Sequence, residues 1–319
     1  MALRVILFAL ASLAPLACLA NDADVPSPPP SPAATPGENN VEEVVVAAPE
    51  PRYVAPTLRD RIGRVWAPVY INGKGPYKLV LDTGANRTAV VPSLAKTIGV
   101  PSDKHVLKVL GATGSAIVPA IKVNSIEVGD LFLGDRQVAI VPDVFGGAQG
   151  VLGADGLSDK RVRIDFKNDE ISIVRSTGPV RANGYTKIPV KLRYGHLLMF
   201  DVKLAGVRTR AMLDTGAQTT IGNSSLRAAL AKRQRQGVEN TIIGVTLDVQ
   251  KGETLLAPAV ELGDLTLRGM QVTFGDMYIF DAWKMTDSPA LLIGMDIIGL
   301  LDTLIIDYKR RELHLRARD

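Results

Sequence analysis

Two short segments of the chain each place one carboxylate directly after an apolar run. Residues 80–85 read Val-Leu-Asp-Thr-Gly-Ala, and residues 212–217 read Met-Leu-Asp-Thr-Gly-Ala. If Asp82 and Asp214 face each other, they cannot both ionise cheaply, so one pKa falls and the other rises. Such a pair supplies an acid and a base at one point, which suits general acid–base hydrolysis.

An Asp-Thr-Gly tripeptide alone is a weak signal, because Asp and Gly are common in turns. Further segments of the chain, however, also occur twice. The matching pairs are 151–155 with 292–296, 126–133 with 260–267, and 164–167 with 306–309. All pairs follow the same order at nearly constant spacing, which predicts an internal duplication with small insertions.

With these motifs the chain resembles the retropepsin-like aspartic proteases of an exported bacterial type. The resemblance is to a fused form in which one chain carries both lobes, as in the pepsins. The resemblance covers roughly residue 58 to the end. It implies a mostly β fold of two homologous β-barrel lobes, related by a pseudo-twofold axis and carrying short helices. It also implies that an apolar-apolar-Gly strand crosses beneath each acid in a ψ-shaped arrangement.

The resemblance also assigns roles to residues. Asp82 and Asp214 would be the catalytic pair, and their glycine neighbours would let backbone N–H groups approach the carboxylates without a Cβ in the way. The two threonines would hydrogen-bond across the lobe interface. The loop residues expected to support the acids are Thr83, Gly84, Thr215 and Gly216, and small substrate-contacting residues are expected at Ala85 and Ala217.

A flap over the cleft is expected from residues 107–119. This stretch lacks the tyrosine that pepsins carry there, but Gly111 and Gly114 fit a hairpin tip that opens and closes over substrate. Both glycines are therefore expected to contact substrate. The equivalent stretch of the second lobe, residues 244–252, looks less like a hairpin tip.

The implied activity is that of an endopeptidase acting on peptides or proteins with a water held between two carboxyls. No cofactor is needed, and the three histidines show no spacing typical of a metal site. Three alternatives remain: a catalytically silent peptide-binding protein, lobes that pair with another copy of the chain, and a structural envelope protein. Both Asp-Thr-Gly loops are intact, which favours the enzyme, and tethering favours a monomer with intrachain lobe pairing.

Residues 1–20 are typical of an export signal, since Arg4 precedes an apolar run that ends in small residues at Ala20. The protein is therefore expected in the periplasm or secreted. The single cysteine, Cys18, lies inside this signal, so the mature chain would have no disulfide. Contact with a membrane is expected only if Cys18 is lipidated.

Residues 21–57 are rich in Pro and Ala and are interpreted as a disordered linker. An alternative is that Val44–Val46 pairs with a sheet edge or belongs to a propeptide. The lobes are expected at residues 58–176 and 184–319. The net charge is +4, without the aromatic-interleaved basic stripe typical of nucleic-acid binding, so no nucleic acid is expected.

Short β-branched runs separated by turn residues predict strands through both lobes. Two helices are expected, at residues 92–96 and 223–233, each after an Asp-Thr-Gly loop. Asp155 and Asp296 follow the apolar-apolar-Gly elements symmetrically. They are interpreted as helix-start or turn caps in preference to a second acid pair.

Overall fold

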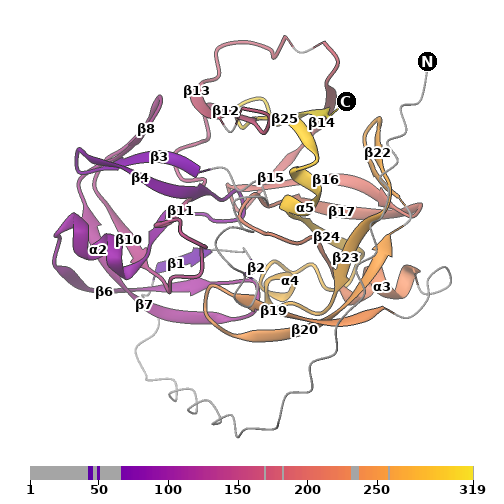
Figure 1. The fold of residues 1–319 in the computed structure, drawn as a ribbon, viewed down its shortest axis with the longest axis horizontal. Helices are drawn as coiled ribbons and strands as arrows, with labels where there is room; N and C mark the ends of the chain where they lie inside the picture. Colours follow the sequence, from indigo (N-terminus) through magenta and orange to yellow (C-terminus); the bar gives the residue numbers. More distant parts are fainter. Residues whose placement is uncertain are drawn as a thin grey trace, which may run out of the picture.

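A computed structural model describes residues 42–45, 49–50, 66–168, 170–181, 183–230, 237–257 and 259–318. The expected export signal and most of the expected linker lie outside these ranges. The described chain is mostly β, and the two expected β-barrel lobes are present (Figure 1). In this view the first lobe, in indigo and magenta, lies at the left and the second, in orange and yellow, at the right.

The first lobe is built on one ten-stranded sheet. Its strands alternate buried and exposed residues where one face meets solvent, as in β3, and are buried throughout near the centre, as at the end of β4. In sheet order the strands are β1 (Glu42–Val45), β6 (Ser102–Leu110), β7 (Ser115–Val123), β10 (Arg136–Ile140), β5 (Ala89–Val90), β11 (Gly150–Leu152), β4 (Lys74–Leu81), β3 (Trp66–Ile71), β8 (Ile126–Val128) and β9 (Leu131–Leu133).

The second lobe repeats this order strand for strand, which is the structural form of the sequence duplication. One extra strand, β15 (Lys191–Arg193), pairs with β16. In sheet order the others are β2 (Pro49–Glu50), β19 (Val238–Gly244), β20 (Val249–Ala257), β23 (Met270–Phe274), β18 (Ile221–Gly222), β24 (Ala290–Ile293), β17 (Val207–Leu213), β16 (Leu197–Leu204), β21 (Val260–Leu262) and β22 (Leu265–Leu267).

A third sheet joins the lobes. Its order is β13 (Glu170–Arg175), β12 (Lys160–Asp165), β25 (Leu301–Asp307), β26 (Glu312–Ala317) and β14 (Thr186–Pro189). The contact between lobes is the antiparallel pair of β12 and β25. One cluster of buried apolar residues also runs through both lobes and this sheet, so the lobes share a core.

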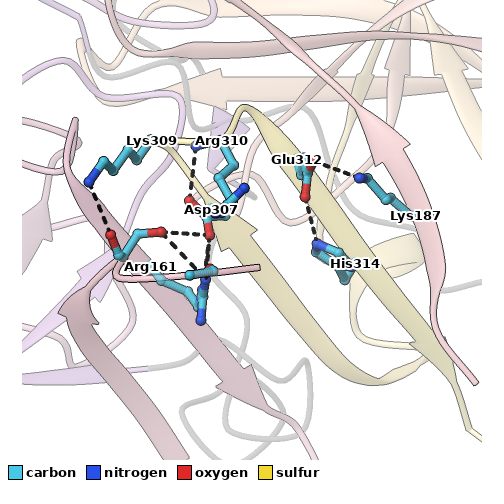
Figure 2. Close-up of polar contacts among 9 residues, drawn as sticks. Arg161, Lys187, Asp307, Lys309, Arg310, Glu312 and His314 are labelled. Carbon is cyan, nitrogen blue, oxygen red and sulfur yellow. Dashed lines mark hydrogen bonds and ion pairs between the residues drawn. The ribbon is translucent and has the colours of Figure 1, made fainter. Parts of the chain in front are cut away.

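A buried carboxylate ties the joining sheet together. Asp307 is fully buried and accepts hydrogen bonds from Arg161 at 2.8 and 3.0 Å, from the Ser176 hydroxyl at 2.8 Å and from the N–H of Arg310 at 3.0 Å (Figure 2). Burial acts to raise the pKa of Asp307, but these hydrogen bonds outweigh it and lower the pKa below its usual value. Asp307 is therefore a charged link between β25 and β12.

Four short helices complete the described chain: α2 (Pro92–Ile98), α3 (Ser224–Leu230), α4 (Tyr278–Ala282) and α5 (Met295–Ile298). The first two confirm the expected helices after the Asp-Thr-Gly loops. The side chain of Asn223 caps α3 by accepting the N–H of Leu226 at 2.9 Å. The expected end of α3 at residues 231–233 lies outside the described residues.

The interpretation of residues 21–57 as a linker without structure is wrong for two pieces of it. Residues 42–45 form β1, which pairs in parallel with β6, and residues 49–50 form β2, which pairs antiparallel with β19. The physical reason is that β6 and β19 each present an outer edge whose backbone groups accept a further strand. The rest of the expected linker lies outside the described residues.

Removal of the Asp307 carboxylate is expected to destabilise the joining sheet strongly. Asp307→Ala would leave Arg161 without its buried partner, so the free energy of unfolding should fall by about 3 kcal/mol. This loss should shrink as pH drops through the lowered pKa of Asp307. Asp307 is then protonated in the wild-type protein, so the charged link is absent from both proteins. Chemical denaturation at several pH values measures both effects.

The matched control is Asp135→Ala, which removes an exposed ion pair with Lys122. Its effect should stay within about 1 kcal/mol. Equal effects of the two substitutions would contradict the role assigned to Asp307.

Candidate active site

Each candidate catalytic acid stands at the end of a buried strand. Asp82 follows β4, Asp214 follows β17, and both are fully buried. The N–H of Asp82 donates to the carbonyl of Leu152 at 2.9 Å, and that of Asp214 donates to the carbonyl of Ile293 at 3.0 Å. These carbonyls belong to β11 and β24, which run parallel to β4 and β17. The apolar-apolar-Gly strands thus support the two acids.

Backbone N–H groups orient one oxygen of each carboxyl. The Oδ1 atom of Asp82 accepts hydrogen bonds from Gly84 at 2.8 Å and from Ala85 at 2.9 Å. The second loop repeats this geometry, since Oδ1 of Asp214 accepts from the corresponding glycine and alanine at 2.9 and 3.1 Å. Two N–H donors fix each carboxyl and favour its charged form.

The two loops pack against each other through their glycines. A Cβ added at Gly84 would lie 2.6 Å from Oδ2 of Asp214, and one added at Gly216 would lie 2.5 Å from Oδ2 of Asp82. Glycine is therefore required at both positions, because a side chain would displace the opposite acid. The structure brings the carboxyls of the two lobes together.

Burial and proximity change the acidity of the pair. Burial raises the pKa of Asp82 well above its usual value, and the charge of Asp214 and a hydrogen bond to that carboxyl raise it further. The N–H groups of Gly84 and Ala85 oppose the rise without cancelling it. The pair therefore keeps a proton at pH values where an isolated aspartic acid is ionised.

Two threonines connect the loops across the lobe interface. The hydroxyl of Thr83 donates to the carbonyl of Leu213 at 2.8 Å and accepts the N–H of Thr215 at 3.1 Å. Reciprocally, the hydroxyl of Thr215 donates to the carbonyl of Leu81 at 2.6 Å and accepts the N–H of Thr83 at 3.1 Å. All four bonds are buried, so they set the distance between the two acids.

Two hairpins meet at their tips. The first consists of β6 and β7 with a tip at residues 111–114, and the second of β19 and β20 with a tip at residues 245–248. The N–H of Gly244 donates to the hydroxyl of Thr113 at 2.9 Å. A Cβ added at Gly111 would lie 3.0 Å from Val245, and one at Gly114 would overlap Asp248. The flaps of both lobes thus touch in this structure.

Comparison with known families agrees with this geometry. The sequence model of the aspartyl protease family matches residues 67–155 and 200–297. The chain belongs to the aspartyl protease family. Each matched segment contains one Asp-Thr-Gly loop and one of the two hairpin tips. Among curated proteins, none matches the chain.

The residues expected to contact substrate lie in two places, the loops around the acids and the tip of the first hairpin. The side chains of Ala85 and Ala217 are fully buried, and their backbones belong to the loops around the acids. Gly111 and Gly114 lie at the first flap tip. Their assignment as substrate contacts stays a prediction.

Sequence reasoning placed the second tip at residues 244–252 but judged it less like a hairpin tip than the first. Residues 245–248 contain no glycine, so the stretch looked less like a hairpin tip than it is. The sequence duplication predicts where the second tip lies. The number of residues from Glu127 to Glu261 equals the number from Gly111 to Val245. The contact of Thr113 with Gly244 was missed, since nothing local predicts it.

Asp155 and Asp296 hydrogen-bond to the segments that follow the Asp82 and Asp214 loops. Asp155 accepts from the hydroxyl of Thr88 at 3.2 Å and pairs with Arg136 at 2.7 Å. Asp296 accepts the hydroxyl and the N–H of Thr220 at 2.6 and 2.8 Å. Burial raises the pKa of Asp296 to about 6, although the bonds from Thr220 oppose this. The interpretation of Asp296 as a helix-start or turn cap is confirmed in part. Asp296 lies in the first turn of α5 and accepts the N–H of Ile297 at 2.9 Å, but the N-cap position itself is Gly294, which has no side chain to cap the helix.

Two further features concern metal ligands and membrane-spanning helices. Within the described ranges, no three His, Cys, Asp or Glu side chains gather as ligands for a metal ion. The helices of the described chain are all too short or too polar to cross a membrane.

Loss of one threonine hydroxyl is expected to weaken the contact between the lobes. Thr83→Val leaves the carbonyl of Leu213 and the N–H of Thr215 buried without their partner, so the free energy of unfolding should fall by about 3 kcal/mol. Thr83→Ser keeps the hydroxyl and should cost less than about 1 kcal/mol. Urea denaturation compares the two variants, and equal stabilities would show that the hydroxyl has no such role.

Proposed function

We propose that this aspartyl protease is an endopeptidase that hydrolyses peptide bonds with a water activated between Asp82 and Asp214. The proposal is supported chiefly by one observation: a buried pair of carboxyls, one from each lobe, in which the pKa of Asp82 is raised well above its usual value. A pair that shares one proton contains a general base and a general acid at the same point.

The proposed reaction is a general acid–base attack by water. The ionised carboxyl takes a proton from the water as its oxygen attacks the scissile carbonyl carbon, while the protonated carboxyl donates to the carbonyl oxygen. The tetrahedral intermediate then breaks its C–N bond as the carboxyl that took the water proton gives it to the leaving nitrogen. The other carboxyl takes a proton from a hydroxyl of the intermediate, so the new product is a carboxylic acid and the pair again holds one proton. The N–H groups on Oδ1 of each acid keep the carboxyls oriented throughout, and the scheme needs no cofactor.

The contact between the two hairpin tips supports a closed state in which the tips cover the site. Both acids are fully buried with the tips of the hairpins in contact, so a substrate enters only after the tips separate. Closure over a bound peptide would then exclude bulk water and strengthen the electrostatic contacts around the reacting bond. The expected substrates are therefore peptides or unfolded protein segments.

The location of the protein and its oligomeric state are also proposals. The apolar run at residues 1–20 supports export to the periplasm or the medium, with membrane contact only through a lipidated Cys18. A monomer is supported by the bonds between Thr83 and Thr215, which complete the pair within one chain.

Neutralising either acid should remove peptidase activity. Asp82→Asn and Asp214→Asn keep the shape of the loops but cannot share a titrating proton, so kcat/KM should fall at least about 100-fold in each. The double variant should be no worse, because the acids act as one unit. Digestion of a peptide library by purified protein identifies a substrate and measures the loss.

The exposed Asp135→Asn serves as the control for these variants and should keep full activity. Circular dichroism and thermal unfolding would verify that all variants fold. Full activity in Asp82→Asn would refute the mechanism. A wild-type protein that binds peptides but never cleaves them would instead identify a catalytically silent peptide-binding protein.

The pH dependence of kcat/KM should be bell-shaped. On the acid side the pair takes up a second proton and loses its base; on the alkaline side it loses its shared proton and with it the acid. Since the pKa of Asp82 is raised, the alkaline limb should lie well above the usual pKa of an aspartic acid. A rate that keeps rising into alkaline pH would contradict a carboxylate pair.

A further inference from the structure

In both lobes a buried threonine connects the segment after the candidate catalytic acid to the strand that supports it. Thr88 and Thr220 each lie six residues after the acid of their lobe. The hydroxyl of Thr88 donates to Asp155 at 3.2 Å, and that of Thr220 donates to Asp296 at 2.6 Å. Each hydroxyl also accepts the N–H of the glycine that follows the supporting strand, at 3.3 and 3.1 Å. Asp155 and Asp296 are therefore equivalent residues of the duplication.

Asp296 bonds to its segment with its backbone as well as with its carboxyl. The second carboxyl oxygen accepts the N–H of Thr220 at 2.8 Å, and the N–H of Asp296 donates to the carbonyl of Gln218 at 3.1 Å. Residues 218–220 follow Asp214 on one short segment. A displacement of Asp296 would therefore move the segment that carries the acid.

The two equivalent carboxyls differ in their cation. Asp155 pairs with Arg136 at 2.7 Å. Arg136 is the first residue of β10 and lies opposite Val123, the last residue of β7. In the second lobe the first residue of β23 is Met270, which lies opposite Ala257, the last residue of β20. Since β10 and β23 hold the same place in the two strand orders, Met270 stands where the first lobe has its arginine.

The described surroundings of Asp296 supply no other cation. Its carboxyl accepts bonds from the uncharged threonine and from the N–H of Ile297, and no described Lys, Arg or His forms an ion pair with it. α5 packs against β24, which has no titratable residue, and against β25, whose acids Asp302 and Asp307 are paired with arginines. β23 has no titratable residue either, and the neighbouring loop contributes Asp214. Burial raises the pKa of Asp296 to about 6, although its hydrogen bonds oppose this.

We propose that Asp296 is a positioning residue of Asp214, acting through Thr220, and that the missing cation makes this support sensitive to pH in the second lobe alone. While the carboxyl is protonated, its burial costs little. Once it is ionised, the charge is stabilised by moving toward water, and the segment bonded to it is displaced. The acid pair is therefore held in place best in an acidic medium. The effect on catalysis rests on the proposed function; the effect on stability does not.

Folding stability tests this support without any substrate. Because folding raises the pKa of Asp296 from its usual 3.8 to about 6, the contribution of the neutral carboxyl is present below the lower value and is lost as pH rises through the upper one. Between about pH 4 and about pH 8, the unfolding constant of the wild type should rise about 50-fold more than that of Asp296→Asn, whose amide does not titrate. Urea denaturation at both pH values measures the difference, and equal changes would overturn the proposal.

Met270→Arg should supply the cation that Arg136 supplies in the first lobe. Carbon-13 NMR of the carboxyls, with the Asp296 signal identified by its loss in Asp296→Asn, should show titration near pH 6 in the wild type and at least about one pH unit lower in Met270→Arg. Gln271→Arg is the matched control, because it adds the same charge at the next, exposed position of β23 and should titrate as the wild type does. An unchanged titration of Asp296 in Met270→Arg would overturn the role of the missing cation.

The reverse exchange, Arg136→Met, replaces this test if Met270→Arg does not fold. It leaves Asp155 without its cation, as Asp296 is in the wild type. The unfolding constant should then rise more steeply with pH than in the wild type. An unchanged dependence would also overturn the role of the cation.

Activity tests whether the support reaches the acid pair. The ratio of kcat/KM at about pH 7 to that at about pH 5 should be several-fold higher in Met270→Arg than in the wild type and in Gln271→Arg, with the change in kcat rather than in KM. An altered titration of Asp296 with an unchanged ratio would overturn the positioning role. If titration and stability change as expected but none of the proteins hydrolyses peptides, the proposed peptidase is refuted and the pH-sensitive support stands.

Discussion

The reciprocal hydrogen bonds of Thr83 and Thr215 are the contact on which the rest of the centre depends. They hold together two loops whose acids would repel each other strongly if both were charged in a buried site. Sharing one proton removes most of that repulsion, and the N–H groups on each Oδ1 stabilise the remaining charge. The threonines thus hold the two carboxyls together although their charges would repel each other. The same closeness lets one carboxyl keep a proton while the other is ionised.

Such loops need a rigid frame on both sides of the interface. Parallel strands β11 and β24 support the loops from within each lobe, and the pair of β12 and β25 with the buried Asp307 fixes the lobes relative to each other. The apolar core is continuous across the boundary. A shift of one lobe would therefore disturb packed side chains and a buried charge as well as the threonines, which favours a single arrangement of the acids.

The sequence predicted best those features that occur twice in it. The Asp-Thr-Gly loops, their supporting strands and the mostly β lobes could be read because each copy supports the other. The helix α4 was not predicted, because it is very short, and the second flap tip was located but judged less like a hairpin tip, because residues 245–248 lack glycine. Composition favoured a linker for residues 42–50, since strand addition depends on an edge built by distant residues.

The two flaps are equivalent in topology but not in attachment. Leu110 packs into an apolar cluster whose other members all belong to the second lobe, and the carbonyl of Ala112 accepts the N–H of Ile279 in α4 at 3.2 Å. Opening the first flap therefore breaks contacts with the opposite lobe, in addition to the bond between Thr113 and Gly244. Next to the tips, the outer edges of β6 and β19 are already paired with β1 and β2, so strands from outside both hairpins also hold them in place.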